Sequence, residues 1–122
     1  MKIVTINNRS VPLNQPIRAG YCTSFWSKFR GLMLQPSLEE GRGIILVESH
    51  DSRVSTTIHM LFMRFDIAAI WLNSRFEVVD VKVAQRWKLA ISPQVPASYV
   101  IETRVNYAGS FHLGDIISFE YD

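Results

Sequence analysis

The chain lacks several features that would assign it to a particular class of protein. A single cysteine, Cys22, excludes an intramolecular disulfide and a site with several thiolate metal ligands. No apolar run approaches the roughly 20 residues of a transmembrane helix. Thirteen basic residues against eleven acidic ones leave a net charge of +2, which is too small for the clustered basic stripe typical of nucleic-acid binding. We therefore expect neither a membrane nor a nucleic-acid partner.

Apolar residues, by contrast, make up 48% of the 122 residues. That proportion suffices for a hydrophobic core, so we expect one domain over residues 1–122. The first residues, Met1–Ile6, alternate like a β-strand and lack the apolar stretch of a signal peptide. We expect a cytoplasmic protein in which Cys22 is a buried, inert thiol.

The range Thr23–Leu34 carries the one convincing helical pattern. Thr23 or Ser24 can accept a hydrogen bond from a free backbone N–H at its start, and Pro36 stops it. Gly31, which is unfavourable inside a helix, indicates either the close approach of another backbone or the end of the helix. Apolar residues at i, i+4, i+7 and i+8 form one face of this helix, namely Phe25, Phe29, Leu32 and Met33.

The rest of the chain alternates short β-like segments with turn signals. This spacing predicts a mainly β fold, either an antiparallel sandwich or a small barrel of about seven strands, with one short helix near the N-terminus. Asn7-Asn8 predicts a tight turn, and Ala84–Ala97 is either a crossover between two sheets or a functional loop. The predicted extended segments are Met1–Ile6, Val11–Leu13, Pro16–Tyr21, Gly43–Val47, Thr56–Phe65, Ile67–Leu72, Phe76–Val83, Ser98–Val105 and Ile116–Tyr121.

The period within each segment also predicts which side chains meet in the core. Trp71 lies within an apolar run and is predicted to be a core residue. Trp87, which charged residues flank on the long loop, is predicted to be an exposed contact. The tightest packing is expected at Phe29, Leu32, Ile45, Ile70, Val79, Val81, Val100 and Ile117.

Several short fragments, taken in order, resemble the domain of unknown function 192 family. They are Phe29-Arg30-Gly31-Leu32-Met33, Ile58-His59, Phe62-Met63-Arg64-Phe65, Tyr99-Val100-Ile101-Glu102, Ala108-Gly109 and Leu113-Gly114-Asp115. The match extends from about Ala19 to Glu120, which is most of the chain. The resemblance implies a small, β-rich, sandwich-like fold with a short helix near the first fragment. It implies no activity, because the family has no established biochemical function.

The chain departs from the family pattern after the Met-Arg-Phe stretch. Family members usually carry Pro-Ile-Asp or Pro-Leu-Asp there, whereas this chain reads Asp66-Ile67-Ala68. The usual acid is thus replaced by Ala68, and Asp66 stands in the position of the proline. Asp66 can take the place of the acid only if the backbone shifts by two residues, which preserves side-chain direction in a strand.

The sequence carries no motif for catalysis or metal binding. The three histidines, His50, His59 and His112, lack metal-ligand spacing, and no G-x-S-x-G is present. A paired-carboxylate site would need the fold to bring together Asp66, Glu102 or Asp115. We therefore predict no metal and no cofactor, and the catalytic residues, if any exist, stay unassigned.

A binding cleft is the remaining possibility. His59, within an apolar segment, is either a core histidine bonded to a backbone carbonyl or part of a pocket mouth. Arg30, on the apolar helix, is either half of an ion pair or an anion-binding group. The candidates for ligand binding are Arg30, His59, Met63, Arg64, Asp66, Trp87, Glu102 and Asp115.

Arg30 and Glu102 are predicted to pair with each other, with Asp115 as the competing partner, because each stands in an apolar setting. Two functions follow from these candidates. The favoured one is a β domain that binds a small molecule or a protein partner. The alternative is a hydrolase-like enzyme that uses Arg30, His59 and an acidic residue in one cleft.

Overall fold

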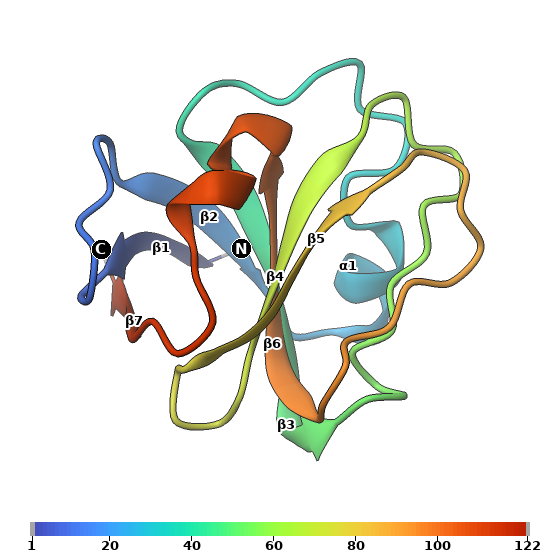
Figure 1. Ribbon diagram of the computed structural model, residues 1–122. Helices are drawn as coiled ribbons and strands as arrows, with labels where there is room; N and C mark the ends of the chain where they lie inside the picture. Colours follow the sequence, from blue (N-terminus) through green and yellow to red (C-terminus); the bar gives the residue numbers. More distant parts are fainter. Residues whose placement is uncertain (1, 122) are drawn as a thin grey trace.

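The computed structural model describes residues 2–121, except for the side chains of Phe25 and Trp26. Seven strands form one sheet in the order β5-β4-β6-β3-β2-β1-β7 (Figure 1). Within the described range no helix is long and apolar enough to span a membrane. The elements are β1 (Lys2–Asn8), β2 (Ile17–Cys22), α1 (Phe25–Arg30), β3 (Arg42–Ser52), β4 (Ile67–Leu72), β5 (Val78–Ala84), β6 (Ala97–Arg104), the 3-10 helix η1 (Val105–Ser110) and β7 (Ile117–Tyr121).

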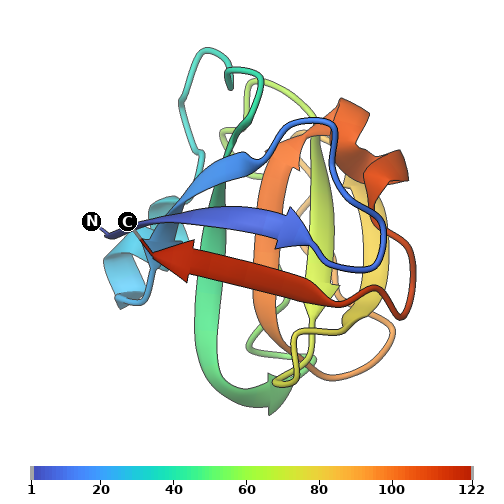
Figure 2. The same cartoon turned by 90° about the vertical axis from the view of Figure 1, so that its left-hand side faces the viewer.

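The sheet curls into a half-barrel. All neighbouring strands are antiparallel except β2 and β3, which are parallel, and α1 lies in the connection between those two strands. Figure 2 shows β1 lying between β2 and β7. The two edges of the sheet meet where Phe76 O accepts a hydrogen bond from Ile117 N at 2.9 Å and Glu77 forms a bridge with Ile116.

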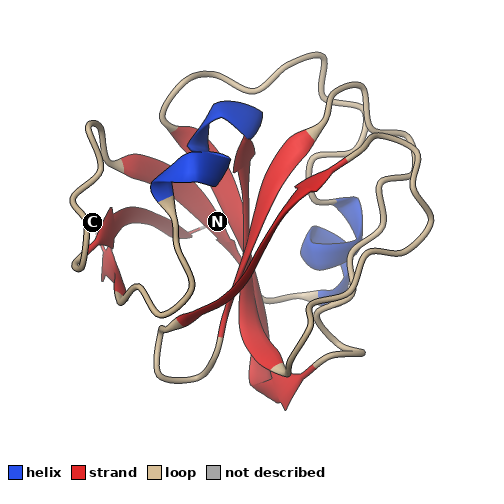
Figure 3. Cartoon of the chain, in the orientation of Figure 1, coloured by secondary structure: helices blue, strands red, loops and turns tan. Residues whose placement is uncertain are grey.

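Alternating side chains divide the core into two clusters, one on each face of the sheet. Strand β4 is buried along its whole length and contributes to both. η1 and α1 lie on opposite sides of the central strands (Figure 3). The inner cluster comprises Val4, Ile6, Ile17, Ala19, Ile45, Ala68, Ile70, Leu72, Val78, Ile101, Tyr107, Phe111 and Ile117. The helix-side cluster comprises Cys22, Leu32, Ile44, Ile58, Met60, Met63, Ile67, Ala69, Trp71, Ala84, Ala97 and Val100.

The mainly β fold and the short N-terminal helix confirm the prediction from sequence, but the helix is shorter than predicted. It begins after Ser24, whose side chain accepts a hydrogen bond from Ser27 N at 3.1 Å. It ends at Gly31, whose φ of +46° is a left-handed backbone conformation that glycine adopts without strain. The residues up to Leu34 form turns, so the predicted range Thr23–Leu34 covers a helix and its exit.

The predicted strand Thr56–Phe65 is wrong. Within it Ile58 forms an isolated bridge with Ile91, and Met60 exchanges backbone hydrogen bonds with Trp87 and Lys88, but no continuous strand results. The chain turns at Phe62, where φ is +59°. The Phe62 carbonyl accepts a hydrogen bond from Leu34 N at 3.0 Å and, among the described residues, none from a strand. The β-branched and aromatic composition therefore indicated burial and not sheet pairing.

Two shorter segments near the N-terminus also differ from the prediction. Asn7 and Asn8 belong to β1 and do not form the turn themselves. The Asn8 side-chain oxygen instead accepts hydrogen bonds from Ser10 N and Val11 N, both at 3.0 Å, and so forms the turn just beyond the strand. The predicted extended piece Val11–Leu13 pairs with no strand.

Most of the predicted core is confirmed. Leu32, Ile45, Ile70, Val100 and Ile117 are buried. The three exceptions are Phe29, which is 47% exposed because it lies at the rim of α1, and Val79 and Val81, which are half-buried. Trp71 is a core residue and Trp87 is exposed, both as predicted, and Cys22 is a buried free thiol.

Truncating the inner cluster should destabilise the fold in proportion to the cavity created. Ile45→Ala is expected to lower the free energy of unfolding by about 2–5 kcal/mol, because Ile45 is fully buried. Val83→Ala, at an exposed position of β5, should cost less than ~0.5 kcal/mol. Urea denaturation monitored by circular dichroism measures both, and equal losses would contradict the assignment of faces.

Candidate functional site

A cavity of about 440 Å³ lies between the sheet and the end of α1. Its floor comes from two neighbouring strands, because Leu46 of β3 lies opposite Val100 of β6, and Glu102 follows two residues later on the same face. Ile44, the cross-strand partner of Glu102, belongs to the helix-side cluster. The floor is therefore apolar except for one carboxylate.

Two irregular segments form the walls of the cavity. One runs from Lys28 to Met33 and turns sharply at Gly31, which brings Leu32 into the core. The other comprises residues 55–59 and Met63. It is held by the bridge between Ile58 and Ile91 and by hydrogen bonds from Thr56 and Thr57 to the backbone oxygens of Ser52 and Arg53.

Glu102 is the most unusual residue of the cavity. It is only 5% exposed, and no described residue donates a hydrogen bond to its carboxylate or forms an ion pair with it. Ile44 and Ala69 lie beside it on the neighbouring strands β3 and β4. Burial disfavours the charged form and raises the pKa of Glu102 to about 7.

The predicted ion pair between Arg30 and Glu102 is therefore wrong. Both residues line the cavity, but Arg30 is exposed and makes no ion pair with any described residue. An adjacent guanidinium would lower the pKa of a carboxyl group, and that of Glu102 is raised. The competing partner, Asp115, lies elsewhere. Arg30 is the last residue of the helix, and its side chain is exposed.

His59 lies at the wall with its ring near Phe29, the ring centroids being 5.2 Å apart. His59 Nε2 is 3.0 Å from the Phe29 carbonyl oxygen, which can only accept, so the neutral ring carries its proton on Nε2. Nδ1 is buried and has no hydrogen-bond partner among the described residues. The histidine thus combines the two alternatives given by the sequence, because it bonds to a backbone carbonyl and also lines a pocket.

The other charged groups of the cavity satisfy one another. Lys28 Nζ donates to Glu48 Oε2 at 2.6 Å and to the Val47 carbonyl at 3.1 Å. This pair joins α1 to β3 at the rim. Across residues 2–121 no group of three His, Cys, Asp or Glu side chains is placed to hold a metal ion. The cavity can therefore offer a ligand one buried carboxylate, apolar walls and an exposed arginine.

The structure brings together four of the eight predicted ligand-binding residues, namely Arg30, His59, Met63 and Glu102. The other four do not line this cavity. Asp115 Oδ2 accepts hydrogen bonds from Asn8 Nδ2 at 2.7 Å and His112 N at 2.9 Å, and so closes the turn before β7. These contacts lower the pKa of Asp115, although its burial opposes them.

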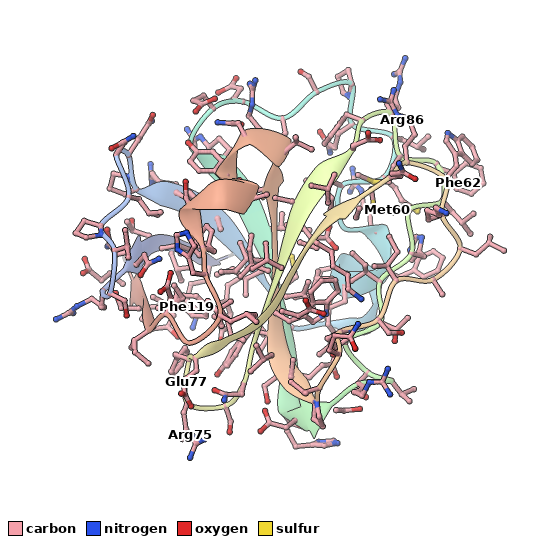
Figure 4. The ribbon with its side chains drawn as sticks, in the orientation of Figure 1. Met60, Phe62, Arg75, Glu77, Arg86 and Phe119 are labelled. Carbon is pink, nitrogen blue, oxygen red and sulfur yellow. The ribbon has the colours of Figure 1, made fainter. Side chains whose placement is uncertain are left out.

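Arg64, Asp66 and Trp87 do not line the cavity. Asp66 Oδ1 accepts hydrogen bonds from Arg86 N at 2.9 Å and Arg86 Nε at 3.0 Å, which lower the pKa of Asp66. Trp87 is 55% exposed and meets the edge of Phe62, with 5.4 Å between the ring centroids. Figure 4 shows Arg86 and Phe62 at one edge of the molecule, with Met60 nearby.

The family of the chain follows from a sequence match across almost its whole length. The DUF192 family model, described as an uncharacterized ACR, matches residues 4–119. The chain belongs to the DUF192 family. The UPF0127 proteins of Thermococcus gammatolerans and Thermococcus kodakarensis are 39% identical over 99 residues and 38% identical over 97 residues. These matches cover 80% and 78% of this chain but 63% and 60% of those relatives, so it spans about three-fifths of their length.

Two crystal structures share the fold of this DUF192 chain. One is of a Sinorhizobium meliloti protein named as a candidate transcription regulator, with a TM-score of 0.83 and 13% identity over 97% of this chain and 92% of the other. The second, a protein of unknown function from Novosphingobium aromaticivorans, has a TM-score of 0.78 and 17% identity over 95% and 83%. At these identities the likeness concerns the fold alone.

The departure from the DUF192 pattern at Asp66-Ile67-Ala68 lies outside the cavity. Ala68 is fully buried in the inner cluster, on the face of β4 that points away from the cavity. Asp66 lies before β4 and binds Arg86. Asp66 therefore orders the turn at Arg86, and the cavity keeps its own acid, Glu102, whether or not position 68 carries one.

Sequence reasoning missed two parts of the DUF192 cavity. The first is the pair of Lys28 and Glu48, which 20 positions separate in the sequence. The second is the wall formed by Thr56 and Thr57, which the sequence placed in a strand. A usable signal existed only for the floor, where Val100 and Glu102 alternate with Ile101 along a predicted strand.

Burial of Glu102 should make stability depend on pH. In the unfolded chain its pKa is about 4.5 and in the folded protein about 7, so the folded state holds the proton more tightly. Below pH 4.5 the ionisation of Glu102 therefore costs the wild type no stability. The free energy of unfolding falls as the pH rises from 4.5 to 7, and above pH 7 it stays lower by about 3 kcal/mol. Glu102→Gln, which cannot ionise, should be free of this loss.

The measurement is urea denaturation at pH 5 and pH 8. The stability of Glu102→Gln relative to wild type should increase between these two values. Glu39→Gln, an identical change at an exposed site, should follow wild type at both. Parallel pH profiles for wild type and Glu102→Gln would show that Glu102 is not ionised at a cost in the folded state.

Proposed function

We propose that the chain is a binding domain for a small molecule, which enters the cavity between α1 and the floor formed by β3 and β6. The observation that carries the proposal is the carboxylate of Glu102, which is buried at the cavity floor without a partner among the described residues. A buried charge without a partner costs several kcal/mol. A ligand that supplies a donor there recovers part of that cost.

The size and lining of the cavity support a small ligand over a protein segment. About 440 Å³ falls within the usual range of roughly 300–1,000 Å³ for small-molecule sites. Leu46, Met63 and Val100 offer apolar contact, while the few polar groups are concentrated at Glu102 and the rim. Such a lining binds an apolar body and orients it by one polar contact.

A hydrolase-like activity is the second candidate, and one observation favours it. Arg30, His59 and the acid Glu102 all line the same cavity. A carboxyl group with a pKa of about 7 can both take up and release a proton near neutral pH, as a general acid or base must. Turnover of a bound compound, lost in Glu102→Gln without loss of binding, would distinguish this candidate from a binding domain.

The test of binding is a thermal melt of the full chain against a library of small apolar compounds. A ligand at ten times its Kd adds about 1.4 kcal/mol, which is roughly 5 °C for a domain of this size. Met33→Trp, which enlarges a half-buried side chain at the cavity wall, should abolish these shifts. Leu38→Trp, at a half-buried position that does not line the cavity, should retain them.

Two outcomes would contradict the proposal. One is a library that shifts no melting temperature, and the other is a set of shifts that persists in Met33→Trp. The cytoplasmic location expected from the sequence is part of the same proposal.

A further inference from the structure

Two oxygen acceptors surround one small space at the end of α1. A Cβ added to Gly31 would be in van der Waals contact with Ile44 Cδ1 at 3.5 Å, Glu102 Oε1 at 3.6 Å and the carbonyl oxygen of Lys28 at 3.7 Å. The Lys28 carbonyl belongs to the last turn of the helix, where carbonyls lack intrahelical donors. Gly31 adds no side chain at this point, and Lys28, Gly31 and Glu102 all line the cavity. A group that enters the cavity here meets Glu102 and a carbonyl, and the ionised carboxylate, like the carbonyl, can only accept.

The two acceptor oxygens, of Glu102 and of the Lys28 carbonyl, determine which charge and shape the ligand group must have. A ligand carboxylate would repel an ionised Glu102, and an alcohol would supply a single hydrogen. A metal ion would need further ligands, and none converges on Glu102 within residues 2–121. A primary ammonium is compact, carries three donors and brings the counter-charge that Glu102 lacks. It therefore fits the space better than the other groups.

We infer that Glu102 and the Lys28 carbonyl bind the primary ammonium group of a small ligand, whose apolar part lies against Leu46, Met63 and Val100. The inference rests on the proposed binding function and adds the chemical class of the ligand. The Lys28 ammonium group, at the same cavity, is already bound to Glu48 and the Val47 carbonyl, so the ligand need not displace it.

The charged groups around Glu102 set how binding depends on pH. Lys28 and Glu48 neutralise each other at the rim, and Arg30 extends into solvent. The remaining titratable neighbours are the imidazole of His59 and the thiol of Cys22. Burial, together with the charge of Glu102, raises the pKa of the Cys22 thiol, which therefore stays neutral.

Amine binding should strengthen as Glu102 ionises. Burial raises the pKa of Glu102 to about 7, whereas an alkyl ammonium group keeps its proton to about pH 10. The ionised fraction of such a carboxyl group is roughly 30-fold larger at pH 8 than at pH 5.5, so the affinity for an amine is expected to rise by about that factor.

The experiment compares three probes that share one apolar body: phenethylamine, 2-phenylethanol and 3-phenylpropionate. Isothermal titration calorimetry measures their Kd for the full chain at pH 5.5 and pH 8. Phenethylamine should bind most tightly at pH 8 and weaken about 30-fold at pH 5.5. Glu102→Gln should lose at least tenfold in phenethylamine affinity at pH 8 and keep its affinity for 2-phenylethanol. Glu39→Gln, exposed and outside the cavity, should behave as wild type.

The outcomes separate this inference from the proposed function. If 2-phenylethanol or 3-phenylpropionate binds as tightly as phenethylamine, and Met33→Trp abolishes that binding, the cavity binds ligands but the ammonium inference is overturned. If no probe binds up to millimolar concentration, the inference is also overturned, and the compound library alone decides the proposed function. The pH dependence of the wild type tests the inference even if Glu102→Gln fails to fold.

Discussion

The structure depends on the enclosure of strand β6 on all four sides. β3 and β4 pair with its two edges, and its alternate side chains enter the inner and helix-side clusters. Ile101 and Val100 satisfy this constraint as ordinary core residues. Glu102 does not, because its carboxylate, flanked by Ile44 and Ala69 and only 5% exposed, has no counter-charge within the described residues. The proposed function follows from that single conflict between strand pairing and charge.

The end of α1 forms one wall of the cavity in which Glu102 lies. α1 ends after six residues at Gly31, whose backbone lies beside the carboxylate: a Cβ there would be 3.6 Å from Glu102 Oε1. The opposite wall is equally irregular, because Phe62 turns the chain before it can pair as a strand. A rigid sheet thus carries the polar group, and two loop-like walls determine the access to it.

Sequence patterns predicted the parts of the fold that depend on interactions between residues close together in the sequence. The apolar run Ile67–Leu72 is a strand with the predicted bounds, and Ser24 caps the helix. Thr56–Phe65 failed because β propensity describes a half-buried surface and cannot supply a pairing partner. The predicted ion pair of Arg30 with Glu102 is wrong for a related reason. Both residues line the cavity, but the spacing of residues in the sequence does not predict in which direction a side chain at the end of a helix points. Four of the predicted ligand-binding residues nonetheless share that cavity.

The pairing of β1 with β7 has a consequence for folding during synthesis. β1 leaves the ribosome before β7 and yet needs it as a neighbour, from Val4 opposite Tyr121 to Asn8 opposite Ile117. Until β7 emerges, β1 exposes an open edge that carries Val4 and Ile6, both fully buried in the finished protein. Such non-local pairing slows folding and leaves a template for association with other chains. The edge of β1 is therefore open to association with other chains until β7 is made.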